Sequence, residues 1–166
     1  DEFGASVAID GDVALIGAQS ADLPGATNGG SVYVFVRSGG EWALEAKLTA
    51  SDAEAGDQFG AAAALSGDIA VVGAPLKDFV GEASHGAAYV FVRSGGSWPE
   101  QARFMSSDHT LGDQFGRSVD IDGTTLIVGA HLADTINGAD SGAAYIFDRT
   151  ESFTWPEQQK LTAFYG

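Results

Sequence analysis

The chain has 166 residues, of which 45% are hydrophobic and 10% aromatic, and it carries 8 Lys and Arg against 23 Asp and Glu. This length fits one domain, and the apolar fraction is enough for a folded core rather than a disordered chain. The formal net charge of −15 argues against a nucleic-acid partner, and no apolar run approaches the roughly 20 residues of a membrane-spanning helix. The absence of cysteine removes disulfides and thiolate metal sites.

An internal repeat of 56 residues runs through the whole sequence. The pairs that mark it most clearly are Phe3-Gly4, Phe59-Gly60 and Phe115-Gly116. A tyrosine follows each pair at a constant distance, at Tyr33, Tyr89 and Tyr145. In the third unit Trp155 comes one residue later than the spacing of Trp42 and Trp98 requires, so an insertion lies between Arg149 and Trp155. We therefore predict one domain of three repeats, 1–56, 57–112 and 113–166.

Taken in chain order, each unit predicts four short strands. In the first unit they span 4–9, 13–16, 31–36 and 42–49. Asp10-Gly11 is a two-residue hairpin signal between the first two strands, and Ser38-Gly39-Gly40 is a tight turn before the fourth. A long loop separates the second strand from the third. Helices are not expected, because Gly recurs too often and no period of 3.6 residues persists.

A four-stranded antiparallel sheet that is repeated along a chain is the unit of a β-propeller, in which each blade lies between two neighbours. Apolar residues on both faces of each predicted sheet fit that arrangement. We therefore predict an all-β propeller with three blades per chain, and because closed rings have four or more blades, both ends should expose an apolar sheet. A second copy docked head to tail would close a six-bladed ring; the alternative is a fragment of a longer propeller.

Two motifs carry a resemblance to a known family. Phe59-Gly60 followed by Gly73-Ala74-Pro75 resembles the FG-GAP repeats of integrin α-subunit propellers, and the segments 33–40 and 89–96, both Tyr-Val-Phe-Val-Arg-Ser-Gly-Gly, are closer still to bacterial FG-GAP repeat proteins. Gln19 and His131 replace the proline in the other two units. The resemblance covers nearly the whole chain and implies a β-propeller, often extracellular, that is used for adhesion or ligand binding.

Some integrin repeats bind calcium through an Asp-x-Asp-x-Asp-Gly loop between the first and second strands. The matching segments here, 9–12, 65–68 and 121–124, are too short to surround a cation that needs six to eight oxygens. We therefore expect no calcium site of that kind, and we interpret Asp10-Gly11 and Asp122-Gly123 as turn residues.

Strand alternation places the tight turns at one end of the blades, and the long acidic loops and the connectors between units at the other. The candidate ligand-binding residues in these loops are Asp22, Asp78, Asp134, Asn28 and Asp140. The three repeated Asp residues could hold Ca²⁺ or a cationic ligand, and Asp52 and Asp108 could belong to the same ring of carboxylates. The alternative is local: an Asp of this kind accepts backbone N–H groups and stabilises its own turn.

Other repeated residues are better explained by structure than by chemistry. Asp1, Asp57 and Asp113, which precede the Phe-Gly pairs, are expected to stabilise turns. Arg37, Arg93 and Arg149 are expected to pair with Asp10, Asp12, Asp68 or Asp122 rather than with an anionic ligand. Trp42, Trp98 and Trp155 are expected to pack against Arg or a neighbouring strand rather than to stack on sugars.

The three histidines, His85, His109 and His131, are not repeated, and no catalytic motif accompanies them. We therefore predict a non-enzymatic binding or adhesion module, extracellular or at the cell surface, whose partners are a second copy of itself and a glycan or protein ligand. Two alternatives stay open: a purely structural, self-assembling scaffold without a ligand, and a propeller glycoside hydrolase. The acidic loops suggest Ca²⁺ as a cofactor and no other.

Overall fold

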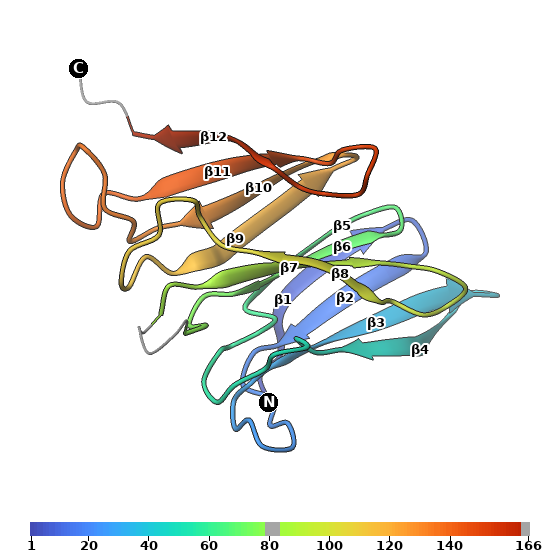
Figure 1. Ribbon diagram of the computed structural model, residues 1–166. Coiled ribbons are helices and arrows are strands. Elements are labelled where there is room, and N and C mark those ends of the chain that lie inside the picture. Colours follow the sequence, from blue (N-terminus) through green and yellow to red (C-terminus); the bar gives the residue numbers. More distant parts are fainter. Residues whose placement is uncertain (79–83, 164–166) are drawn as a thin grey trace.

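The computed structural model describes residues 1–78 and 84–163, and within them it contains twelve strands and no helix (Figure 1). Blade 1 consists of β1 (Phe3–Asp10), β2 (Val13–Ala18), β3 (Ser31–Ser38) and β4 (Glu41–Leu48). Blade 2 consists of β5 (Ala62–Ser66), β6 (Ile69–Ala74), β7 (Ala87–Val92) and β8 (Glu100–Phe104). Blade 3 consists of β9 (Phe115–Asp122), β10 (Thr125–Ala130), β11 (Ala143–Asp148) and β12 (Glu157–Thr162). The three antiparallel four-stranded sheets confirm the predicted all-β fold.

Each blade is a simple meander, with its strands hydrogen-bonded in chain order. The first hairpin of each blade turns at a glycine with left-handed backbone: φ is 57° at Gly11, 56° at Gly67 and 58° at Gly123. Glycine adopts this conformation at little cost, which explains why the turn keeps the same residue in all three units. In blades 2 and 3 the fourth strand begins later than expected, so Trp98 and Trp155 precede it rather than open it.

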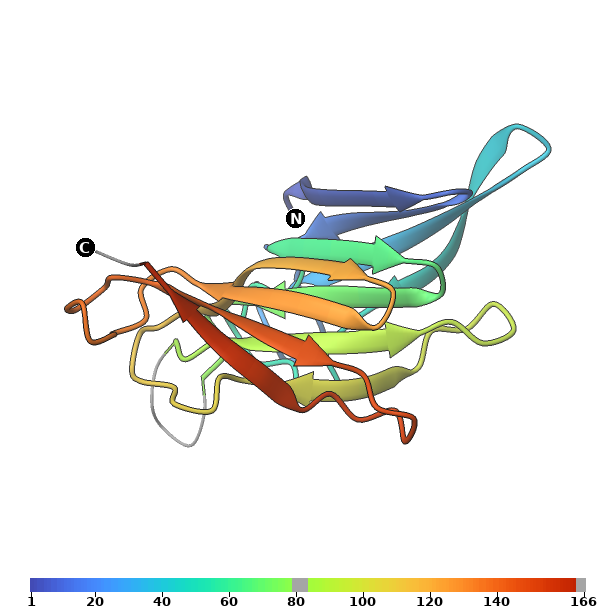
Figure 2. The same ribbon diagram turned by 90° about the horizontal axis from the view of Figure 1, so that it is seen from above.

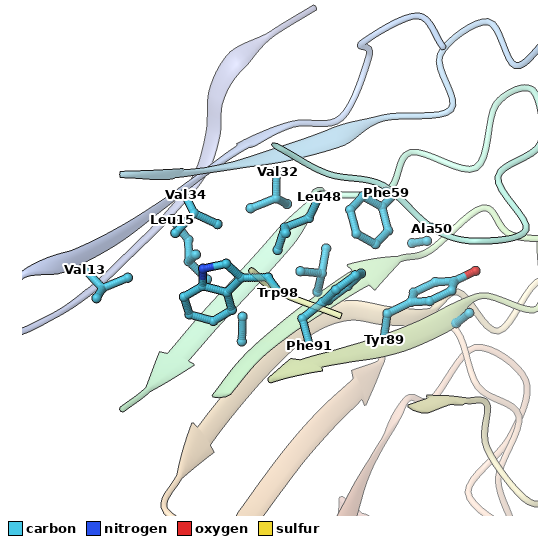
Figure 3. Close-up of a cluster of buried hydrophobic side chains, with 14 residues drawn as sticks. Val13, Leu15, Val32, Val34, Leu48, Ala50, Phe59, Tyr89, Phe91 and Trp98 are labelled. Atoms are coloured by element: carbon cyan, nitrogen blue, oxygen red, sulfur yellow. The ribbon is translucent and has the colours of Figure 1, made fainter. Parts of the chain in front are cut away.

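The blades stack face to face, and the two interfaces between them form the core (Figures 1 and 2). The innermost strands β1, β5 and β9 lie in succession. Between blades 1 and 2, aliphatic side chains such as Leu15 and Val34 meet an aromatic group of Phe59, Phe91 and Trp98 (Figure 3). A second cluster of the same composition fills the space between blades 2 and 3. Each blade thus presents an aliphatic face to the next blade and an aromatic face to the previous one.

The Phe-Gly pair marks the place where one blade meets the next. The backbone N–H of Phe59 donates to the carbonyl of Gly29, and that of Phe115 donates to the carbonyl of His85 (3.1 and 2.9 Å). An added Cβ at Gly73 would overlap the carbonyl oxygen of Gly116. The repeated glycines are therefore required by a close backbone approach between blades.

Two sheet faces have no neighbour among the described residues. The blade 1 end face carries the exposed side chains Phe3, Val7, Ile9, Trp42 and Leu44. This face is as apolar as the sequence predicts.

The blade 3 end face is only partly apolar, which differs from the expectation. Ile127 and Ile146 lie at its centre on adjacent strands, and Leu161 is 40% exposed. Around them, four positions that are alanine, valine or isoleucine in blades 1 and 2 are polar: Asp120, Thr125, Asp148 and Gln159. Thr125 donates a hydrogen bond to Asp148 across the sheet (2.6 Å). Polar groups of this kind are tolerated where solvent reaches the sheet.

Candidate functional site

The long loops and the connectors between blades share one end of the molecule, as expected, and we call this the long-loop end (Figure 1). Connector and loop are tied by backbone hydrogen bonds: Gly56 donates to Thr27 and Gln58 to Asn28 between blades 1 and 2, and Gln114 donates to Ser84 between blades 2 and 3. The opposite end holds the tight turns. The long-loop end is therefore one continuous surface built on a rigid sheet scaffold.

The three predicted loop carboxylates occupy the same position in each blade. The side chains of Asp22, Asp78 and Asp134 each accept the backbone N–H of the residue six positions later, which is Asn28, Ser84 and Asp140 (2.9, 2.7 and 2.9 Å). Those three residues share a left-handed backbone, with φ between 51° and 57°. Each Asp thus holds its loop in a strained conformation, which is the local role that sequence reasoning gave as the alternative.

The structure brings Asp22 to Asn28 and Asp134 to Asp140 through these contacts, and all four residues are exposed. Across the described ranges 1–78 and 84–163, no three His, Asp or Glu side chains gather closely enough to hold a metal ion. Calcium or ligand binding by these residues stays a prediction.

A buried lysine that sequence reasoning missed organises the connector between blades 1 and 2. The Nζ atom of Lys77 lies 2.8 Å from Glu54, 3.2 Å from Asp57 and 3.8 Å from Asp52, and its side chain is 3% exposed. Burial would lower the pKa of Lys77, but the hydrogen bond to Glu54 and the charges of Asp57 and Asp52 raise it. Lys77 is therefore charged at neutral pH and stabilises a cluster of carboxylates.

Asp57, one of these carboxylates, has the turn role that was expected of it. It is 2% exposed and accepts the backbone N–H of Glu54 (2.7 Å), and burial raises its pKa. Asp113 is equally buried and accepts the backbone N–H and the hydroxyl of Thr110 (2.7 and 2.6 Å). The turn interpretation of these two residues is confirmed.

Asp52 and Asp108 link each connector to the blade that follows it. Asp52 accepts a hydrogen bond from the Tyr89 hydroxyl (2.9 Å) and pairs with Arg103. Burial would raise the pKa of Asp52, but the Tyr89 hydroxyl and the charges of Lys77 and Arg103 lower it. Asp108 repeats the arrangement with Tyr145 and Lys160 (2.9 and 2.7 Å). Each carboxylate thus ties its connector to the third and fourth strands of the following blade.

The tryptophans pack as expected, whereas the arginines follow the expectation in part: Arg93 pairs chiefly with Glu45 and lies 3.9 Å from the predicted Asp68, and Arg149 lies over the Phe153 ring. Arg37 pairs with Asp12 (2.7 Å) and lies over the Trp42 ring. Arg93 and the indole N–H of Trp98 both donate to Glu45 of blade 1 (2.6 and 3.0 Å). The hydrogen bond from Arg93 lowers the pKa of Glu45. Trp98 and Trp155 are buried at 6% and 7% exposure, so neither can serve as a sugar platform.

Two histidines meet at the long-loop end although sequence reasoning gave no reason to pair them. The ring centroids of His85 and His109 lie 5.1 Å apart, with His85 buried and His109 exposed. The Nδ1 atom of His109 lies 2.9 Å from the carbonyl oxygen of Ser106. His131 is exposed in its loop. No local motif could have signalled the pair, because its members belong to a loop and to the following connector.

No helix within the described ranges is long and apolar enough to cross a membrane. A comparison with curated proteins finds no matching relative. The family model for the FG-GAP repeat, by contrast, matches residues 1–35, 42–91 and 98–147. The second and third matches each begin at the tryptophan before or within the outer strand of one blade and end in the third strand of the next. They therefore span the interfaces where the Phe-Gly contacts lie, and the chain belongs to the FG-GAP repeat family.

Proposed function

We propose that the chain is a non-enzymatic interaction module whose long-loop end binds a cationic ligand, such as a basic segment of another protein, or a ligand held through Ca²⁺. FG-GAP repeats generally form non-enzymatic propeller modules, which supports this class of function. We place the module outside the cell or at its surface, as the family resemblance implies.

One observation carries the proposal. Each blade presents an exposed carboxylate at the same loop position, Asp22, Asp78 or Asp134, with the same loop geometry and at the same end of the scaffold. Because the chain carries a net charge of −15, cations are attracted to this surface over a distance of about 8 Å at physiological salt. A repeated carboxylate on a rigid frame is suited to bind a ligand with several positive charges.

The test separates the charge of these residues from their role in the loops. Replacing all three Asp by Asn keeps an oxygen that can accept the backbone N–H but removes the charge, whereas replacement by Ala removes both. We expect the Asn variant to melt like the parent chain and to lose binding to Ca²⁺ and to an oligolysine peptide in isothermal titration calorimetry. Retention of both bindings by the folded Asn variant, or their absence in the parent chain, would contradict the proposal.

A second candidate is a purely structural scaffold, which the hydrogen bonds of the three Asp residues favour. Each of these side chains accepts a backbone N–H that closes its own loop. In that case the Ala variant should lose thermal stability, the Asn variant should not, and the melting temperature should rise with salt and stay constant with Ca²⁺. A screen with a glycan array covers the remaining class of ligand.

A further inference from the structure

The two interfaces inside the chain show which groups of one blade contact the next blade. The blade 1 and blade 3 end faces carry the complementary groups of the same contacts. We propose that the blade 1 end face of a second copy docks on the blade 3 end face of the first, and that two such contacts close a six-bladed ring. This inference goes beyond the ligand-binding proposal and uses a different surface.

The first matching half is a place for a Phe-Gly pair on blade 3. Gly73 and Gly86 of blade 2 leave room for the backbone of Phe115 and Gly116, and an added Cβ at either would overlap that backbone. Blade 3 has glycine at the same two positions, Gly129 and Gly142, but an added Cβ there would meet only its own blade: the rotatable hydroxyl of Ser118 at Gly129 and the carbonyl of His131 at Gly142. The space that a following Phe-Gly pair needs is therefore present on blade 3.

The second half is the Phe-Gly pair of blade 1, which is exposed. Phe3 is 57% exposed, whereas Phe59 and Phe115 are fully buried. Its ring packs on Tyr33 with centroids 5.4 Å apart, the same separation as between Phe59 and Tyr89. An added Cβ at Gly4 would meet nothing within 4 Å. Blade 1 thus presents the same aromatic group that blades 2 and 3 bury against the preceding blade.

A third contact, at the end with the tight turns, also has both halves. Asp10 of blade 1 accepts the backbone N–H of Gly67 in blade 2 (2.7 Å), and Ser66 accepts that of Gly123 in blade 3 (3.0 Å). Asp122 is at the position of Asp10 on blade 3, and Gly11 is at the position of Gly67 on blade 1. In the ring, Asp122 of one copy would accept the N–H of Gly11 in the other.

One substitution distinguishes blade 1 from the other two blades at this contact. In blades 2 and 3, Glu100 and Glu157 accept the N–H and hydroxyl of Ser51 and Ser107 in the preceding connector. Blade 1 has Leu44 at the position of this glutamate, and Leu44 is 56% exposed. A connector with serine would find no carboxylate there.

The polar surround of the blade 3 end face fits a contact between separately folded copies. At its centre, Ile127 and Ile146 line a hollow of about 300 Å³ whose border also includes Asp120 and Thr125, and Gln159 lies on the other edge strand. Interfaces between separate subunits have an apolar centre and a polar rim. A blade face of four short strands covers roughly 300 Å², so two contacts with two faces each would bury about 1,200 Å², the lower limit for a stable dimer.

The experiment uses one charge on each end face and measures mass by analytical ultracentrifugation. The parent chain should sediment as a dimer of about 34 kDa, twice its 17.0 kDa. Leu44→Asp and Ile146→Asp should each give the monomer, because each variant damages both contacts of its ring. Their mixture should recover a dimer, because one of its two contacts then joins two unaltered faces. Ile136→Asp, at a site that is 98% exposed in a long loop, is the matched control and should stay dimeric.

Circular dichroism of each monomeric variant shows whether it remains folded, and Gly129→Ala gives a second route that adds no charge. We expect this variant to dissociate as well, since its methyl group would meet the carbonyl of Gly4 in the partner. A parent chain that stays at 17.0 kDa at 100 μM would overturn the proposal. A dimer that persists in Ile146→Asp but not in Leu44→Asp would also overturn it, because that result indicates contact between two blade 1 faces. A mass that increases continuously with concentration, as expected for filaments, would overturn it as well. Failure of ligand binding by the long-loop end leaves each of these results unchanged.

Discussion

Removal of the buried Lys77 charge should destabilise the fold strongly, and a second substitution should restore much of the loss. Lys77→Ala leaves Asp57, which is 2% exposed, without its positive neighbour. Breaking a buried ion pair by removing one partner costs about 3–5 kcal/mol. The lower part of this range applies, because the side chains of Glu54 and Asp52 are 64% and 30% exposed and water can solvate them after the change.

The interface between blades 2 and 3 shows how the same site works without a lysine. There the position of Lys77 is Ala133 and the position of Glu54 is Thr110, whose hydroxyl donates to the buried carboxylate of Asp113 at 2.6 Å. Lys77→Ala combined with Glu54→Thr copies that arrangement, so it should recover more than half of the stability lost by Lys77→Ala alone.

Urea unfolding followed by tryptophan fluorescence, at one fixed protein concentration, measures the free energy of unfolding of the parent chain, both single variants and the double variant. The penalty of Lys77→Ala should shrink as the pH falls through the pKa of Asp57, which burial raises above its ordinary value, because the protonated carboxyl no longer needs the lysine. A double variant that is no more stable than Lys77→Ala would refute the proposed role of the lysine in this cluster. So would a Lys77→Ala variant whose free energy of unfolding lies within about 0.5 kcal/mol of the parent chain, which is the scatter of ordinary surface substitutions.

Three further outcomes can be measured by the same unfolding assay. The indole N–H of Trp155 is buried and has no hydrogen-bond partner among the described residues. Gln101 is at the position equivalent to Glu45, which accepts the indole N–H of Trp98, so Gln101→Glu should raise the free energy of unfolding by about 1 kcal/mol. The absence of a gain would contradict the equivalence of the two interfaces. Gly73→Ala should cost several kcal/mol, since its methyl group would overlap the backbone of the next blade, and a neutral result would refute the close approach. Burial would raise the pKa of Asp108, but its hydrogen bonds and the nearby lysine lower it, so its contribution to stability is present above about pH 4 and is lost as the pH falls. Asp108→Asn should therefore slightly reduce the loss of stability in acid, and an unchanged loss would contradict a stabilising role of the Asp108 charge.

The sequence predicts the fold well because the repeat reports the same information three times. The two-residue turn at Asp10-Gly11 and the alternation in 31–36 each specify a local structure, and their recurrence excludes chance. The reason for the glycine of the Phe-Gly pair could not be predicted in this way. Gly60 has a φ of 92° and lies against the preceding blade, a contact between residues far apart in the chain that only the packed structure shows.

The candidate site was predicted less well, because comparison of repeats detects what the units share. Lys77 is alanine in the other two units, at Ala21 and Ala133, so the repeat pattern conceals it. Its signal in the sequence was a lone lysine in an acidic region. The pairing of His85 with His109 likewise depends on how a loop meets the next connector, which no spacing rule describes. Residues that occur in only one of the three units therefore cannot be assigned a role from the repeat pattern.

The two end faces differ in how apolar they are, and in the proposed ring this difference would decide which face supplies the free energy of assembly. Blade 1 leaves Phe3, Val7, Ile9, Trp42 and Leu44 between 40% and 71% exposed. Full burial of one such side chain stabilises by about 1.5–3 kcal/mol, so covering the remaining surface of five is worth on the order of 5 kcal/mol. That is comparable with the whole stability of a small domain. The blade 3 end face has less apolar area and more hydrogen-bonding groups, so in the proposed ring it would govern the orientation of docking, while blade 1 would supply the greater part of the driving force.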